Sequence, residues 1–137
     1  MTMDANAITA VAVGVHDGSL SFPQSVAALV AEGVEYYHVD FVAQSCRYSG
    51  AAGSSVVAPL AFEGLPPIAP EFDAQALKAA ILDSQAHGQK YRQFCERAVR
   101  AGVQGYFAFL RGQRVTYLGR TGDQHVEWFP GAKPGDA

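Results

Sequence analysis

The chain of 137 residues has few charged side chains and few cysteines, and both shortages exclude classes of protein. Charged residues make up 17% of the chain, the 10 lysines and arginines are scattered, and the net charge is −3. Binding to nucleic acid requires a concentrated positive face, so we expect no nucleic-acid partner. Cys46 and Cys95 are too few to supply a disulfide framework, so we expect reduced thiols and a cytoplasmic protein.

Long hydrophobic runs and recognisable cofactor motifs are also missing. The longest apolar stretch, residues 7–15, has about half the length that a membrane-spanning helix needs. Residues 1–6 before it carry only the acidic Asp4 and lack the basic start of a signal peptide. The sequence contains no phosphate loop, dinucleotide fingerprint or cysteine-pair metal motif. We expect no membrane association and no cofactor.

The features that are present are the composition of a globular protein and an internal repeat. Apolar residues make up 49% of a length that is common for one domain. When the chain is shifted against itself by 69 residues without a gap, 14 positions are identical. The first-copy members of these pairs are Asp4, Ala5, Ala7, Ala10, Gln24, Val30, Gly33, Val34, Tyr37, Gln44, Tyr48, Gly50, Gly53 and Val57. Two copies predict a pseudo-symmetric domain rather than a solenoid.

Each copy predicts two helices at its start. Asp73 suits the N-cap of a helix over residues 74–86. Asp4 is its equivalent, so we predict a helix for the first segment too, although the apolar pattern there leaves helix and strand open. A second helix is expected to follow Ser21 and to end at Gly33, because glycine readily adopts the left-handed cap conformation.

Three strands are expected after the helices of each copy, which gives an α+β fold. The predicted strands span residues 34–42, 44–48 and 54–60, then 103–110, 113–118 and 124–129. We predict an internal duplication of an α-α-β-β-β unit, with an antiparallel sheet and helices packed on one face. The predicted single domain, residues 1–137, has repeats at about 4–62 and 73–130, a proline-rich connector at 63–72 and a flexible tail at 131–137.

The sequence resembles the YbcV-like family of uncharacterised bacterial proteins, some of them labelled phage envelope proteins. The resemblance covers residues 22–130 and is strongest over residues 115–130. It rests on Phe22-Pro23, Gly33-Val34, Tyr37-His38-Val39-Asp40, Ala101-Gly102-Val103, Tyr117, Gly119-Arg120, Gly122-Asp123, Val126-Glu127 and Phe129-Pro130. It implies the same fold and a possible prophage origin, but it supplies no activity.

The first strand of each copy contains the main candidates for a functional site. Strand alternation places Tyr37 and Val39 on the core face, and it places Tyr36, His38 and Asp40 on the other face. The equivalents of these last three residues are Gly105, Phe107 and Phe109. The copies therefore agree on the core face and differ on the opposite one, where we expect any functional divergence to lie.

Three interpretations of His38 and Asp40 stay open. The pair can be a solvated strand surface or a local hydrogen-bond pair at the seam between the copies. It can be a general acid–base pair, because histidine titrates near neutral pH. It can also join His125 and Glu127, which have the same alternate spacing, in a divalent-metal site.

Arg120 and the aromatic residues supply further binding candidates. Arg120 lies in the last turn, where it can pair with Glu127 or bind an anionic ligand. The strands expected to be half exposed also contain many aromatic residues, namely Tyr36, Phe107, Phe109, Trp128 and Phe129. An apolar patch on a sheet face is typical of a partner-binding surface. We therefore predict a non-enzymatic binding or interaction protein that contacts a second copy or another protein through the aromatic sheet face. The alternative is a small-molecule enzyme or divalent-metal-binding protein that uses His38, Asp40, His125 and Glu127.

Overall fold

The computed structural model describes residues 3–60 and 62–134. Its first helix, α1 (Ala5–His16), begins at Asp4, whose carboxylate accepts hydrogen bonds from the backbone N–H groups of Asn6 and Ala7 at 2.9 and 3.2 Å. Helix α3 (Ala74–His87) begins in the same way, because Asp73 caps the N–H of Ala76 at 3.0 Å. The prediction of a helix for the first segment is confirmed.

Helices α2 (Phe22–Ala31) and α4 (Tyr91–Arg100) follow α1 and α3 after short loops. Ser21 and Gln24 form a reciprocal capping box at the start of α2, with distances of 3.3 and 2.9 Å. Gly33 follows α2 and Gly102 follows α4, with φ angles of 84° and 89°. These are left-handed conformations that glycine adopts without strain, so the predicted helix ends are confirmed.

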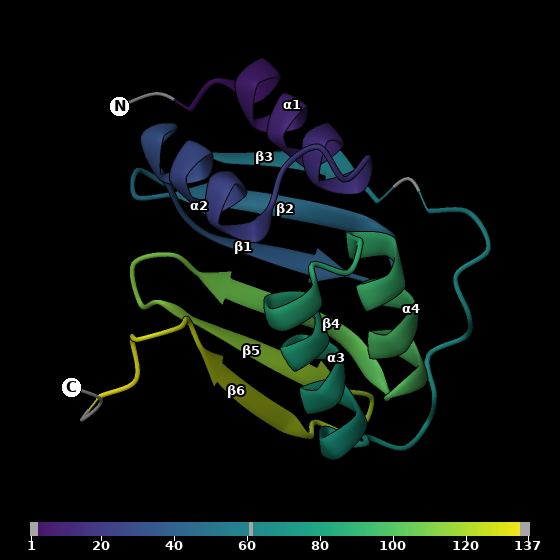
Figure 1. Ribbon diagram of the computed structural model, residues 1–137. Helices are drawn as coiled ribbons and strands as arrows, with labels where there is room; N and C mark the ends of the chain where they lie inside the picture. The colour runs from purple at the N-terminus through teal and green to yellow at the C-terminus, as the bar shows by residue number, and fades with distance from the viewer. Residues whose placement is uncertain (1–2, 61, 135–137) are drawn as a thin grey trace.

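Six strands form one antiparallel sheet in the order β3-β2-β1-β4-β5-β6. The strands of the first half are β1 (Val34–Asp40), β2 (Ser45–Gly50) and β3 (Ser55–Pro59), and those of the second half are β4 (Val103–Phe109), β5 (Arg114–Gly119) and β6 (Gln124–Trp128). Helices α1 and α2 cover β1–β3, and α3 and α4 cover the other strands on the same side of the sheet (Figure 1). The predicted α+β architecture is confirmed.

The two halves have the same internal register as well as the same element order. Tyr37 pairs with Tyr48 in the first half, and Tyr106 pairs with Tyr117 in the second. Both halves have an irregularity at the start of the first strand. Gln44 and Gln113, at equivalent positions between the first two strands, are the only non-glycine residues with positive φ in the described chain, at 54° and 56°. Equivalent sequence positions therefore adopt equivalent backbone conformations.

The core lies between the helices and the sheet. Tyr37 and Val39 of β1 are buried there at 7% and 2% exposure, whereas Tyr36 is 39% exposed. The predicted division of β1 into two faces is confirmed. No helix in the described part of the chain is long and apolar enough to cross a membrane.

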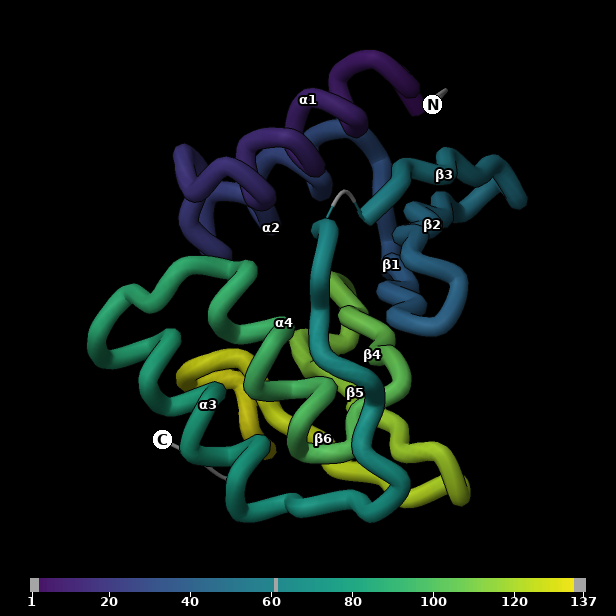
Figure 2. Tube along the Cα trace, turned by 90° about the vertical axis from the view of Figure 1, so that its right-hand side faces the viewer, coloured from purple at the N-terminus to yellow at the C-terminus, as the bar shows by residue number. Residues whose placement is uncertain are grey.

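The connector between the halves passes close to α4 (Figure 2). Its backbone bonds to the end of that helix, from Ala69 N–H to the Val99 carbonyl at 2.9 Å and from Asp73 N–H to the Ala101 carbonyl at 2.8 Å. The connector has no helix or strand of its own in the described residues, as its three prolines predict. The tail expected at 131–137 lies partly outside the described residues.

Candidate functional site

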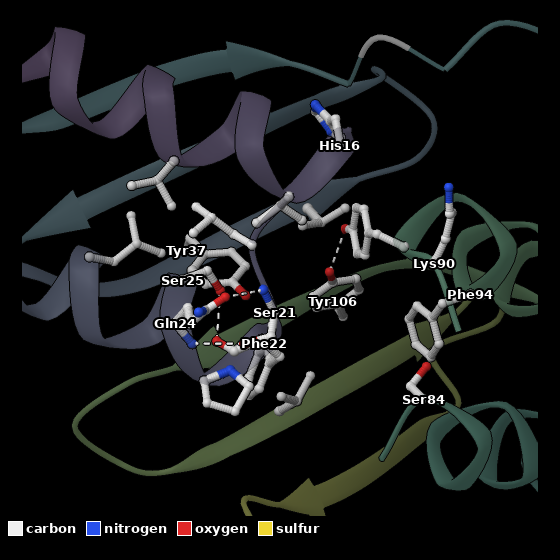
Figure 3. A pocket seen from close by; sticks show the side chains of 18 of the residues that line it. His16, Ser21, Phe22, Gln24, Ser25, Tyr37, Ser84, Lys90, Phe94 and Tyr106 are labelled. Carbon is white, nitrogen blue, oxygen red and sulfur yellow. Dashed lines mark hydrogen bonds between the residues drawn. The ribbon is translucent and has the colours of Figure 1, made fainter. Parts of the chain in front are cut away.

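A cleft of about 710 Å³ lies on the helix side of the sheet, between the two helix pairs. We call it the helix-side cleft; it is bordered by the loops that join α1 to α2 and α3 to α4, and it reaches the strands below (Figure 3). Its volume falls within the range of about 300–1,000 Å³ that is typical of ligand pockets. The cleft lies between the helix pairs because each pair covers its own part of the sheet.

Tyrosines form the floor of the helix-side cleft. Tyr37, Tyr48, Tyr106 and Tyr117 come from four neighbouring strands, and Tyr91 comes from the first turn of α4. Burial is the main cause that raises the pKa of each of these hydroxyls above the usual value of about 10. The hydroxyls are therefore neutral at physiological pH and can donate hydrogen bonds.

One pair of these tyrosines is joined directly. The hydroxyl oxygens of Tyr91 and Tyr106 lie 2.5 Å apart, and we call these two residues the tyrosine pair (Figure 3). The position equivalent to Tyr91 in the first half is Phe22, and the one equivalent to Tyr106 is Tyr37. Phe22 has no hydroxyl and packs edge-on against Phe129, with ring centroids 5.3 Å apart. The cleft therefore has two chemically different sides.

Ionisable groups lie around the cleft. His16 lies against Phe62 with ring centroids 4.7 Å apart, and burial lowers its pKa, which favours the neutral imidazole. Lys90 is exposed beside the start of α4. Glu127 lies on the edge strand β6, and its carboxylate is 3.1 Å from His125 Nε2. The lining thus combines aromatic rings with neutral donors and few charges.

His38 and Asp40 lie on the opposite face of the sheet, which carries no helix in the described chain and which we call the helix-free face. His38 stacks on Phe107 with ring centroids 4.2 Å apart, and burial lowers its pKa. The Asp40 carboxylate accepts hydrogen bonds from the N–H groups of Val42 and Ala43 at 2.9 and 3.0 Å. It therefore supports the turn after β1, and among the described residues it accepts no hydrogen bond from His38.

The four proposed metal ligands are not brought together. His125 and Glu127 pair with Tyr117 and Val115, whose side chains are buried on the helix side of the sheet, whereas His38 and Asp40 lie on the helix-free face. The sheet therefore separates the two His–carboxylate pairs. Across the described residues, no group of three or more His, Cys, Asp or Glu side chains is arranged to hold a metal ion. The metal-site hypothesis for these four residues was wrong.

Arg120 also has a different partner from the one expected. Its guanidinium donates to the backbone carbonyl of Ile68 in the connector at 3.3 Å, rather than to Glu127. Asp123 accepts a hydrogen bond from the Thr121 hydroxyl at 2.6 Å within the same turn. Arg120 lies at the far end of the β5–β6 hairpin and links that turn to the connector.

The predicted aromatic surface exists in part. On the helix-free face, Phe109 lies between Tyr36 and Phe107, with both centroid distances at 5.9 Å. Trp128 lies beside Arg114, whose guanidinium carbon is 4.5 Å from the ring centroid. Phe129 was wrongly assigned to this surface, because it packs against Phe22 at the border of the helix-side cleft.

The two cysteines are buried and free. Cys46 lies on β2 and Cys95 inside α4, and burial raises the pKa of each thiol to about 12. The thiolate is the reactive form, so neither side chain is suited to nucleophilic catalysis.

Sequence reasoning did not find the helix-side cleft. The available signal was the set of four strand tyrosines, Tyr37, Tyr48, Tyr106 and Tyr117. They form two pairs with a spacing of 69 residues and lie on the face that the alternation assigns to the core. Buried tyrosine hydroxyls need partners, so four of them on one face indicate a core that is partly open.

Comparison with known proteins places the chain in a family. An uncharacterized protein of Mycobacterium bovis is 32% identical over 81 residues, which cover 56% of this chain and 49% of the relative. Uncharacterized proteins from two strains of Mycobacterium tuberculosis match equally well, so the chain spans about half the length of these relatives. The model of a family described as "Protein of unknown function (DUF1398)" matches residues 15–126. That description includes neither the YbcV-like label nor a phage association. The chain therefore belongs to the DUF1398 family of proteins of unknown function.

Proposed function

We propose that the protein is a non-enzymatic binding protein that holds a small, mainly apolar molecule in the helix-side cleft. The observation that carries this proposal is the cleft of about 710 Å³ over a floor of tyrosines. Aromatic walls with a few polar groups are the usual composition of ligand pockets. The neutral hydroxyls supply hydrogen bonds that fix orientation, and the rings supply apolar contact area.

A blocked cleft tests this proposal. Ser84 lies in the cleft lining on α3, and its hydroxyl accepts a hydrogen bond from the Gln89 side chain at 2.7 Å. We expect Ser84→Trp to fill part of the cleft and to weaken binding of the fluorescent probe anilinonaphthalene sulfonate at least tenfold. Lys78→Trp, on an exposed part of the same helix, is the matched control and should bind like the wild type. Equal binding by both variants would rule out the cleft as the site.

We also propose that the two halves arose by duplication of one α-α-β-β-β unit and now form one domain. The equal registers and the equivalent positive φ angles of Gln44 and Gln113 support this. The halves share the β1–β4 ladder, so they should unfold together. Calorimetry is expected to give one transition whose calorimetric and van't Hoff enthalpies agree. Two separate transitions would contradict the single domain.

A second candidate function is self-association through the helix-free face. Val57, Tyr36 and Val126 are 63%, 39% and 43% exposed on strands β3, β1 and β6 of this face. Exposed apolar side chains on an uncovered sheet favour a second copy as the partner. Sedimentation should then show a dimer that Val57→Asp weakens, whereas Val13→Asp, on exposed α1, does not. A wild-type protein that stays monomeric at high concentration would exclude this candidate.

A further inference from the structure

The tyrosine pair has one more proton than its own hydrogen bond uses. Tyr91 and Tyr106 each carry one O–H group, and their oxygens lie 2.5 Å apart. One hydroxyl donates and the other accepts, so the accepting hydroxyl still has its own proton to donate. Both tyrosines belong to the lining of the helix-side cleft. The remaining proton is therefore available to the space of the cleft.

Tyr37 adds a second donor from the neighbouring strand. It occupies the position equivalent to Tyr106, but Phe22 replaces the tyrosine that would pair with it. Its side chain is 7% exposed, lines the cleft, and has no hydrogen-bonding partner for its hydroxyl among the described residues. The rings of Tyr37 and Tyr106 lie 6.5 Å apart between centroids, on the adjacent strands β1 and β4. Two donor hydroxyls are thus available side by side on the cleft floor.

The charges around these donors favour an acceptor that is negatively charged. The first turns of α2 and α4 both border the cleft, and the positive ends of their dipoles lie there together with the Lys90 side chain. Glu127 is the carboxylate in the lining, but it lies on β6, two strands from Tyr106 and three from Tyr37. At the usual strand spacing these separations are about 10 and 14 Å. Glu127 is also engaged by His125.

We propose that the ligand of the helix-side cleft is an aromatic carboxylic acid, whose carboxylate accepts hydrogen bonds from Tyr37 and from the tyrosine pair while its ring lies in the apolar part of the cleft. This inference rests on the proposed binding function and specifies its ligand class. A carboxylate has two oxygens and accepts two or more hydrogen bonds, which matches the two available donors. The rings of Phe94 and Phe22 border the space available to the aromatic body.

Three probes of equal ring size test the ligand class by titration calorimetry with the full chain. Naphthoate carries a carboxylate, acetonaphthone carries a neutral carbonyl oxygen, and methylnaphthalene carries no acceptor. We expect affinity to fall in that order, with naphthoate roughly tenfold or more tighter than methylnaphthalene, since hydrogen bonds to a charged acceptor are the stronger kind.

Matched tyrosine variants test the donors. Tyr37→Phe and the double variant Tyr91→Phe/Tyr106→Phe remove hydroxyls and keep the rings, and each should weaken naphthoate binding roughly tenfold while leaving methylnaphthalene binding unchanged. Tyr36→Phe is the control, because this substitution also removes a tyrosine hydroxyl, but on the opposite face of the sheet. Circular dichroism checks that each variant is folded, and the single and double variants provide two independent tests.

The outcomes separate this inference from the proposed function. If the three probes bind with equal affinity and Tyr37→Phe changes nothing, the cleft binds apolar molecules but the carboxylate assignment is wrong. If none of the probes binds, or if Ser84→Trp leaves naphthoate binding intact, both proposals fail. The expected ranking, together with loss in both tyrosine variants and none in Tyr36→Phe, supports the assignment.

Discussion

His38 and Phe107 stack face to face at the centre of the sheet, with ring centroids 4.2 Å apart and ring planes 4° from parallel. They are directly paired in the β1–β4 ladder, and they are also equivalent positions of the two halves. The two halves therefore contribute equivalent positions to this contact. A stacked pair on an otherwise open sheet face connects the halves by side chains as well as by backbone hydrogen bonds.

We expect the stack to contribute measurable coupling across the seam. A double-mutant cycle with His38→Ala and Phe107→Ala should give an interaction energy of about 0.5–1.5 kcal/mol, the range for aromatic pairs. Urea denaturation measures it. A cycle between His38→Ala and Val126→Ala, which lie three strands apart, is the control and should be additive. Additivity in both cycles would contradict a stabilising stack.

Stability should fall on mild acidification. Burial lowers the pKa of both His16 and His38, so the unfolded chain binds more protons than the folded one as pH falls below the unfolded value of about 6.5. The contribution of these two histidines to the free energy of unfolding is thus fully present above that pH. It decreases as the pH drops toward their pKa values in the folded protein. Urea denaturation at about pH 7 and pH 5 checks this, and the double variant His16→Gln/His38→Gln should show a smaller decrease.

The covering ring also controls the pKa of His38. Desolvation is the largest cause of its lowered pKa, and Phe107 lies directly over the imidazole. Phe107→Ala should admit water and move the pKa of His38 upward, toward about 6.5. A proton NMR titration of the imidazole measures the shift. A lower pKa in the variant would contradict this account.

Gly102 is expected to be essential where α4 meets the connector. Its φ is 89°, and a Cβ there would meet the backbone carbonyl of Glu71 and would lie 2.9 Å from the Cα of Phe72. Gly102→Ala should therefore cost about 3 kcal/mol or more, from backbone strain plus overlap with a neighbouring backbone. Gly122→Ala is a matched control with the same φ of 89° and no atom within 4 Å, and it should cost only about 1–2 kcal/mol. If thermal unfolding showed the same loss of stability for both variants, the connector backbone would have moved to accommodate the added Cβ.

Gln44 and Gln113 carry strain that glycine can relieve. Their φ angles of 54° and 56° lie in the left-handed region, which costs a residue with a Cβ about 1–2 kcal/mol. Gln113→Gly should be neutral or should stabilise by up to about 1 kcal/mol, because the greater freedom of glycine in the unfolded chain offsets part of the gain. Gln44→Gly should behave alike. Gln124→Gly, within β6, is the contrasting control and should destabilise the protein.

The thiols should be inert in the folded protein. Burial raises the pKa of Cys46 and of Cys95 to about 12, so little thiolate exists near pH 8. Ellman's reagent should react with both thiols within seconds in denaturant and far more slowly without it. Rapid reaction of the native protein, at a rate that does not depend on its stability, would show that a thiol is accessible.

The sequence predicted the helices and strands because the interactions that begin, end and orient them act between residues close together in the chain. An aspartate at a helix start and a glycine at a helix end act within a few residues, so Asp4, Asp73, Gly33 and Gly102 could be interpreted without tertiary structure. The alternation in β1 is also a local property, and it separated Tyr37 from its outward-facing neighbours.

The candidate site depended on relationships that local signals do not contain. The face on which His125 and Glu127 lie follows from the register of β6 against β5, and a shift by one residue would reverse it. The cleft depends on the separation of two helix pairs, which no spacing in the sequence encodes. The bond from Arg120 to Ile68 likewise joins two segments 52 residues apart.

The antiparallel pairing of β1 with β4 also determines what a broken chain would do. A fragment that ended before the connector would retain β1 as an edge strand, with one side of its backbone unpaired along seven residues. Such an edge is a template for another chain. Because position 38 pairs with its own equivalent, two such fragments could join β1 to β1 in the register that the intact chain uses. Cleavage in the connector would then yield either a dimer of fragments with the same six-stranded sheet or an aggregate. The intact connector prevents both, because it keeps β4 paired with the edge of β1.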